Sequence, residues 1–270
     1  MLRENLPDLA DRDLVDAVAE KAVNVRRLLR NIARDFAPAV FANSLGAEDM
    51  VLTDMIFSEG LDIGVFSLDT GRLPEETHAL IAATEARYGR RIEIAYPRHD
   101  LLAQTVARQG INGFYDSLEA RKACCHARKV EPLQRLLAGK KAWVTGLREA
   151  QAATRGGLQT RAYDQANDLV KFSPLANWSE REVWVYLRAN QVPYNKLHDQ
   201  NYPSIGCAPC TRAVQAGEDV RAGRWWWETP EQKECGLHVV DGKVQRVAAV
   251  GAPEASVRSG AGDTAAGVAA

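Results

Sequence analysis

The sequence predicts an α/β fold with a mainly parallel sheet that is covered by helices on both faces. Two short apolar runs, 39–42 and 63–68, are each followed by a loop and then by apolar residues at helical spacing. Further strand-like runs follow at 91–96, 142–145 and 168–172. Strands that alternate with helices of this length are typical of parallel sheets, because each helix returns the chain to the same edge of the sheet.

The expected helices are marked by their apolar spacing and by residues typical of helix ends. Residues 14–36 carry apolar side chains at steps of three or four, which predicts an N-terminal covering helix. The next marked helix has Pro74 in its first turn and Gly89 after its end. Ser179 and Glu182 have the spacing of a capping box. Three more helices are expected around residues 50–56, 100–108 and 130–137.

We divide the chain into four parts. Residues 1–37 are expected to form a helical segment, residues 38–224 the α/β domain and residues 225–246 a C-terminal segment. Residues 247–270 are mostly Ala, Gly, Ser and Val without an aromatic side chain. Because so little apolar bulk cannot build a packed core, we expect this last part to be disordered.

Charge and hydropathy exclude two classes of partner. The 270 residues include 34 Lys and Arg against 35 Asp and Glu, a net charge of -1, so no general attraction to nucleic acid is expected. No run approaches the roughly 20 apolar residues that cross a bilayer. The first residues are acidic and polar, unlike a secretory signal. We expect a cytoplasmic protein with no membrane or nucleic-acid partner.

Two loops follow the first two strands, at the edge where parallel sheets bind ligands. The first, 44–49, precedes a helix, so its N–H groups suit a phosphate-like anion, although a plain connection would have the same pattern. It lacks the Gly-Lys-Ser/Thr ending of a P-loop and the three glycines of the dinucleotide-binding fingerprint. In the second loop, Asp69 could hold an adenosine while Thr70 or Arg72 approaches an anion.

The five cysteines are unevenly placed. Cys124 and Cys125 are adjacent, Cys207 and Cys210 form a C-x-x-C, and Cys235 stands alone. In a reducing compartment such grouping indicates a metal site or redox chemistry. The two pairs suit either a [4Fe–4S] cluster or a zinc ion with four cysteine ligands. Zinc sites more often use two spaced pairs, which favours iron–sulfur, and adjacent cysteines can share a cluster only where the backbone is bent.

Four motifs together resemble the adenylyl-sulfate and phosphoadenylyl-sulfate reductases of sulfate assimilation. They are Ser-Leu-Gly-Ala-Glu-Asp at 44–49, Leu-Asp-Thr-Gly-Arg-Leu at 68–73, Thr-Gly-Leu-Arg at 145–148 and Glu-Cys-Gly-Leu-His at 234–238. The resemblance spans roughly residues 38 to 240 and implies an adenine-nucleotide alpha-hydrolase-like fold with a modified pyrophosphate loop. It implies cluster ligands at Cys124, Cys125, Cys207 and Cys210. The expected substrate contacts are Ser44, Gly46, Ala47, Glu48, Asp49, Leu68, Asp69, Thr70, Gly71, Arg148, Arg155, Arg221 and Arg224.

The chemistry that this resemblance implies is a two-step sulfonyl transfer that serves cysteine biosynthesis. The Cys235 thiolate attacks the sulfur of adenylyl sulfate and displaces AMP, and a thioredoxin-like dithiol then releases sulfite. His238 is suited to carry a proton or to favour the thiolate. Lys129 corresponds to the family lysine that couples cluster and substrate. Arg128 is more readily interpreted as part of a solvated helix face.

Other functions stay open at this point. The 3′-phosphorylated nucleotide is the nearest alternative substrate, and an iron–sulfur enzyme that thiolates tRNA could use the same fold. A zinc-stapled binding module is a non-enzymatic alternative. The triplet Trp225 to Trp227 either packs a tail against the body or docks thioredoxin. A homo-oligomer is possible.

Overall fold

The computed structural model describes residues 7, 9–151, 157–229, 239–240 and 243–244. The predicted disordered tail, 247–270, lies outside the described residues. Within them, a six-stranded sheet has the order β3-β2-β1-β4-β6-β5, and only β5 is antiparallel to its neighbour. The strands are β1 Ala39–Ala42, β2 Ile63–Leu68, β3 Glu93–Ala95, β4 Ala142–Val144, β5 Arg161–Asp164 and β6 Leu169–Phe172, and a separate pair is formed by β7 Val239–Val240 and β8 Lys243–Val244.

The mainly parallel α/β sheet predicted from the sequence is confirmed, with one strand that the sequence did not indicate. Strand β5 is the antiparallel edge strand, and three of its four residues are exposed. It therefore lacks the apolar run by which buried strands are recognised. A turn in which Asp168 has a φ of 53° returns the chain from β5 into β6.

The helices begin and end close to the positions that their end signals predict. Helix α3 starts after Pro74 and stops at Gly89, whose φ of 63° is the left-handed conformation that glycine adopts easily. The capping box of Ser179 and Glu182 opens α7. The helices are α1 Arg12–Asp35, α2 Ala47–Ser58, α3 Glu75–Tyr88, α4 His99–Gln109, α5 Leu118–Cys125, α6 Glu131–Leu137 and α7 Glu180–Ala189. Among the described helices, none is long and apolar enough to cross a membrane.

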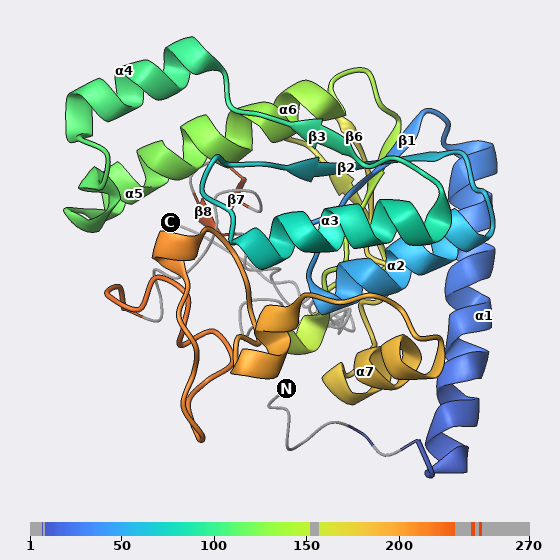
Figure 1. Ribbon diagram of the computed structural model, residues 1–270. Coiled ribbons are helices and arrows are strands. Elements are labelled where there is room, and N and C mark those ends of the chain that lie inside the picture. The colour runs from blue at the N-terminus through green and yellow to red at the C-terminus, as the bar shows by residue number, and fades with distance from the viewer. Residues whose placement is uncertain (1–6, 8, 152–156, 230–238, 241–242, 245–270) are drawn as a thin grey trace, which may run out of the picture.

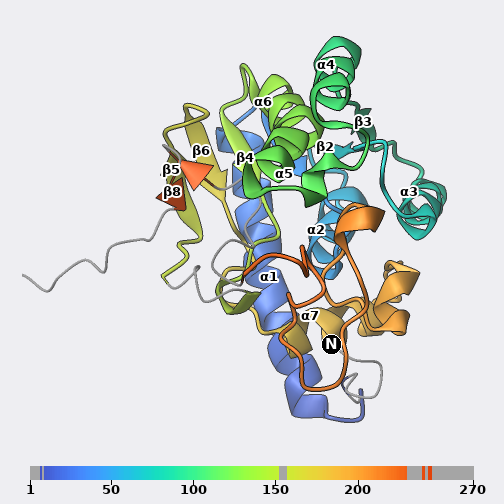
Figure 2. The same cartoon turned by 90° about the vertical axis from the view of Figure 1, so that its left-hand side faces the viewer.

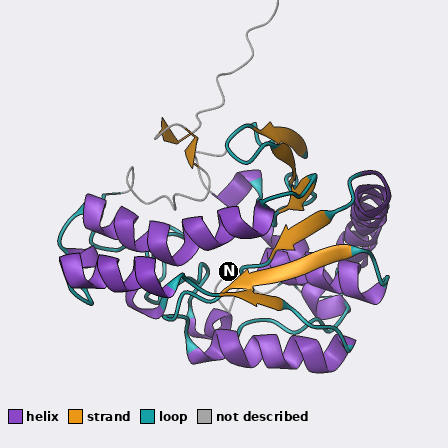
Figure 3. Cartoon of the chain, turned by 90° about the horizontal axis from the view of Figure 1, so that it is seen from above, coloured by secondary structure: helices purple, strands orange, loops and turns teal. Residues whose placement is uncertain are grey.

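Helices cover both faces of the sheet (Figures 1 and 3). Because side chains alternate along a strand, neighbouring residues enter different cores. Phe41 and Val65 join the core that includes α1, α2 and α7, while Val40 and Phe66 pack with Leu133 of α6 on the other face. The parallel strands are thus buried on both sides, which leaves their carboxyl ends as the open edge.

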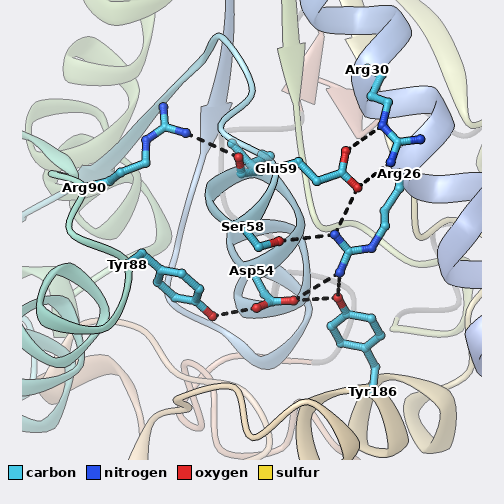
Figure 4. A network of polar contacts seen from close by, with 9 residues as sticks. Arg26, Arg30, Asp54, Ser58, Glu59, Tyr88, Arg90 and Tyr186 are labelled. Carbon is cyan, nitrogen blue, oxygen red and sulfur yellow. Dashed lines mark hydrogen bonds and ion pairs between the residues drawn. The ribbon is translucent and has the colours of Figure 1, made fainter.

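A buried carboxylate ties four covering helices together (Figure 4). Asp54 of α2 accepts hydrogen bonds from the hydroxyls of Tyr88 in α3, at 2.8 Å, and Tyr186 in α7, at 2.6 Å. Arg26 of α1 donates to the Tyr186 hydroxyl at 2.7 Å and pairs with Asp54 at 3.5 Å. Burial, and then the nearby Asp54 charge, raise the pKa of both tyrosines, so they remain donors at neutral pH.

Replacement of this carboxylate should destabilise the fold. In Asp54→Ala the two tyrosine hydroxyls lose their shared acceptor, which should lower the free energy of unfolding by about 2–4 kcal/mol. Asp35→Ala is the control, because Asp35 pairs with Arg34 at the surface and its loss should not be measurable. Urea unfolding followed by circular dichroism measures both. Equal stability of the two variants would contradict a structural role for Asp54.

Candidate active site

A cavity of about 420 Å³ lies at the carboxyl ends of β1, β2 and β4. Its walls include Asn43 after β1, Leu68 at the end of β2 and Thr145 after β4. The segment that follows α7, orange in Figure 2, supplies a further wall that includes His198 and Arg224. This is the edge at which open parallel sheets bind their ligands, and the volume is in the range of small-molecule sites.

The loop after β1 is held in shape by its own side chains. Leu45 has a φ of 62°, an uncommon conformation for a branched residue, and its N–H donates to Asn43 Oδ1 at 2.7 Å. The Asp49 carboxylate accepts from both the N–H and the hydroxyl of Ser44, each at 2.6 Å. Gly146 lies so close that a Cβ there would overlap Asp49 Oδ1. A side-chain carboxylate therefore occupies the two Ser44 donors, one part of the loop that was expected to face a substrate anion.

Glu48, the other acidic residue of this loop, neutralises a cation that was expected to bind substrate. Arg148 Nη2 lies 2.6 Å from Glu48 Oε1, and both side chains are largely buried. Burial alone would raise the pKa of Glu48, but the charge and hydrogen bond of Arg148 outweigh it and the pKa lies below its usual value. Arg148 lines the cavity, yet its charge is paired inside the protein. The wall around Glu48 and Asp49 is consequently rich in acceptors.

The loop after β2 lies between the cavity and the cysteines. Leu68 lines the cavity, but among the described residues Asp69, Thr70 and Gly71 do not. Asp69 accepts from the Gly71 N–H at 2.8 Å and lies 2.9 Å from His78 Nε2. The Thr70 hydroxyl lies 3.2 Å from Cys207 Sγ. The Asp69 carboxylate therefore stabilises the loop itself, and its expected adenosine-binding role remains a prediction.

The two cysteine pairs meet in one small pocket beside the cavity. Cys124 and Cys125 come from the end of α5, while Cys207 immediately precedes the short 3₁₀ helix η7, Ala208–Cys210, and Cys210 ends it. The pocket is also lined by Arg72, Phe114, Arg121, Arg128, Lys129 and Pro209. The cysteine placement expected from sequence is therefore compatible with the structure, and four cationic side chains surround the sulfurs.

The polar groups around these sulfurs fit a cluster of iron and sulfur. Trp225 is fully buried with three of the cysteines, and its Nε1 has no hydrogen-bond partner among the described residues. Burial, together with neighbouring Cys207, raises the pKa of Cys210 to about 12, so thiolates here need compensating positive charge. In the described part of the chain, no three His, Cys, Asp or Glu side chains are grouped to hold a single metal ion. In a [4Fe–4S] cube each thiolate binds its own iron, so the sulfurs surround a volume.

Similarity to known proteins agrees with this arrangement. The model of the phosphoadenosine phosphosulfate reductase domain matches residues 38–213. The chain belongs to this reductase family. It is 58% identical over 223 residues to the adenosine 5′-phosphosulfate reductase of Allochromatium vinosum, covering 83% of this chain and 87% of that protein. With the reductase of the same name from Burkholderia cepacia it shares 51% identity over 226 residues, 84% of this chain and 90% of the relative.

Solved structures support the same fold. The phosphoadenylyl-sulfate reductase of Candida auris, solved as a phosphate complex, has 25% identity and a TM-score of 0.60, covering 78% of this chain and all of that one. Yeast FAD synthetase shares the fold alone, with 15% identity, a TM-score of 0.52 and coverage of 77% of this chain and 70% of that protein. The phosphoadenosine phosphosulfate reductase domain therefore has the architecture of enzymes that handle adenine nucleotides.

The adjacent cysteines of this family member are accommodated without a sharp bend. Helix α5 ends at Cys125 and runs directly into a wider π-helical turn, η3 His126–Val130, before α6. Both cysteines lie in the last turn of α5, directly before this wider turn, and line the pocket; π turns are frequent at functional sites. Arg128 is buried within the turn and donates to the Thr70 carbonyl at 2.5 Å, so its interpretation as a solvated residue is wrong. Lys129, the next residue, lines both the cavity and the cysteine pocket.

The segment before the C-terminal tail is anchored beside the cysteines. Arg121 and Glu228 form a buried bidentate ion pair, with contacts of 2.9 and 2.7 Å. The Arg121 guanidinium also stacks on Trp225, 4.7 Å from the ring centre. Trp225 therefore packs in the interior, while Trp226 is 40% exposed. Neither member of the ion pair was indicated by the sequence, because the partners are 107 positions apart.

The remaining predicted site residues divide into two groups. Ser44, Gly46, Ala47, Arg221 and Arg224 line the cavity. Arg155, Cys235 and His238 lie outside the described residues, so their roles remain predictions. His198 was missed by the sequence analysis, because one histidine in an irregular segment carries no pattern.

The acidic loop should give the protein a distinctive pH dependence. Burial, opposed by hydrogen bonds from Ser44, raises the pKa of Asp49 to about 6. The folded chain thus holds this proton more tightly than the unfolded chain, so the contribution of Asp49 to stability falls as pH rises from about 4 to about 6. Asp49→Asn cannot titrate.

As pH rises across this window, the free energy of unfolding of wild type should therefore fall by up to about 3 kcal/mol relative to that of Asp49→Asn. Chemical unfolding at several pH values measures it. Parallel stability curves for the two proteins would contradict the prediction.

Proposed function

We propose that this chain reduces adenosine 5′-phosphosulfate to sulfite and AMP in sulfate assimilation. The observation that carries the proposal is the junction of two sites: a nucleotide-sized cavity and a pocket of four cysteines, both of which Lys129 lines. Relatives that share half or more of its aligned residues bear this activity in their names. A reducing compartment such as the cytoplasm would keep the thiols available.

The four pocket cysteines would hold a [4Fe–4S] cluster. The donor set supports this, since Thr70 lies within hydrogen-bond reach of Cys207 and the buried Trp225 Nε1 and Arg128 Nε lack partners among the described residues. A bound cluster would cross-link α5 to the η7 segment and add charge that orients the cations around it. Lys129, Arg221 and Arg224 line the cavity and would bind the phosphate and sulfonate oxygens.

The reaction would proceed through the solitary cysteine of the tail. The Cys235 thiolate attacks the substrate sulfur, a sulfur–sulfur bond forms, and the bond from sulfur to the phosphate oxygen breaks so that AMP leaves with the electron pair. A thiolate of reduced thioredoxin then attacks Cys235 Sγ and expels sulfite. The second thioredoxin thiol closes a disulfide and restores Cys235, so the dithiol supplies both electrons. His238 would favour the thiolate form of Cys235.

The nucleophile can be tested by the covalent adduct that it should carry. Wild-type protein incubated with adenosine 5′-phosphosulfate, without reductant, should gain one sulfonate on the peptide that contains Cys235, detected by mass spectrometry. Cys235→Ser should form no adduct and release no sulfite, because the serine hydroxyl is a far weaker nucleophile. Incubation with AMP is the control. An adduct on another residue would contradict this mechanism.

The cysteine pocket is tested by replacing one of its four expected ligands. Cys207→Ser should lose the visible absorbance of the cluster and its bound iron, because one of four thiolate ligands is gone. Cys235→Ser is the matched control and should keep both. Iron analysis and visible absorption measure the outcome. Full iron content in Cys207→Ser, or bound zinc in place of iron in the wild type, would refute the ligand assignment.

A further inference from the structure

His198 presents a buried acceptor to the cavity. It belongs to the 3₁₀ helix η6, Lys196–Gln200, is 5% exposed and lines the cavity wall. Its ring lies edge-on to Trp184, with centroids 5.3 Å apart. Its Nδ1 lies 2.8 Å from the Tyr202 carbonyl oxygen. The ring is therefore fixed from two sides.

The contacts of His198 define which ring nitrogen carries the proton. A carbonyl oxygen only accepts, so Nδ1 must hold the hydrogen that it donates to Tyr202. Burial lowers the pKa of His198 despite the opposing charge of Glu48, which favours the neutral ring. Nε2 then has a lone pair. It is buried and has no hydrogen-bond partner among the described residues, so it is suited to accept from a ligand.

The cavity that His198 lines also carries two carboxylates. The carboxylate of Glu48 interacts electrostatically with His198 and is paired with Arg148 at 2.6 Å, and Asp49, the next residue, also lines the cavity. Hydroxyl groups can rotate to donate to such acceptors, whereas the adenine edge would also bring ring-nitrogen lone pairs toward them. A phosphate monoester brings negative oxygens without donors, so it would set acceptors against the Nε2 lone pair. The cationic side chains that suit phosphate, Lys129, Arg221 and Arg224, also line the cavity.

We propose that His198 Nε2 accepts a hydrogen bond from the ribose 3′-hydroxyl and that this acceptor disfavours a 3′-phosphate, which brings no donor to it. This deepens the proposed function, on which it rests, by assigning the choice between the two sulfonucleotides to a named side chain.

Calorimetric binding of AMP, 2′-deoxy-AMP, 3′-deoxy-AMP and adenosine 3′,5′-bisphosphate tests the proposal. Wild type should bind AMP about tenfold tighter than 3′-deoxy-AMP, the value of one net hydrogen bond to a buried group. His198→Leu should bind AMP about tenfold more weakly, with no further loss for 3′-deoxy-AMP. Its preference for AMP over the bisphosphate should fall about tenfold.

Two further measurements keep the test independent of any one variant. His198→Gln places an amide oxygen near the position of Nε2 and should retain a preference for AMP over 3′-deoxy-AMP. In wild type, the ¹⁵N chemical shift of His198 Nε2 should move when AMP binds and should not move in the same way with 3′-deoxy-AMP. Circular dichroism and thermal unfolding check that each variant is folded.

The outcomes separate this inference from the proposed function. Equal weakening of AMP and 3′-deoxy-AMP by His198→Leu would overturn it, as would a loss that follows the 2′-hydroxyl instead. If the protein produces sulfite from adenosine 5′-phosphosulfate but His198→Leu does not change the preference for AMP over 3′-deoxy-AMP, the His198 assignment alone is refuted. Coupling to the 3′-hydroxyl in a protein that releases no sulfite would refute the proposed function alone.

Discussion

The contact between the loop after β2 and the cysteine pocket is the interaction on which the site depends. Thr70 joins both: its hydroxyl lies 3.2 Å from Cys207 Sγ, and its carbonyl accepts from the buried guanidinium of Arg128. The Ala208 N–H donates to the Arg72 carbonyl at 2.8 Å. Three segments that are distant in sequence thus share one set of hydrogen bonds, and the nucleotide cavity and the sulfur site are held at a fixed separation.

The acidic loop after β1 gives the cavity a second character. In many nucleotide-binding folds this position offers bare N–H groups to a phosphate. Here Asp49 takes the N–H of Ser44, and Glu48 pairs with Arg148. The cations Lys129, Arg221 and Arg224 line the same cavity as these two carboxylates. Under the proposed function, this mixture of charges would orient a ligand that is anionic at one end and hydroxylated at the other.

Local patterns predicted the elements of the fold well, because the residues that mark a strand or a helix end lie within a few positions of one another. The Pro74 and Gly89 signals and the Ser179 capping box all match helix ends, and the buried parallel strands match their apolar runs. Partnerships across the chain could not be predicted in this way. The pairing of Arg148 with Glu48, 100 positions away, gave no local signal. Arg128 looked like a solvated residue, whereas it is buried within the π turn. No sequence pattern indicated His198, because its proposed role depends on a buried Nε2 that has no hydrogen-bond partner among the described residues.

The buried ion pair of Arg121 with Glu228 has a geometric consequence for the proposed nucleophile. Glu228 is fixed beside the cysteine pocket, and Cys235 is only seven positions further along the chain. A fully stretched chain spans at most about 3.6 Å per residue, so the Cα atom of Cys235 cannot be more than about 25 Å from that of Glu228. A tether this short gives the proposed nucleophile a local concentration around this anchor far above that of a free thiol in bulk solution.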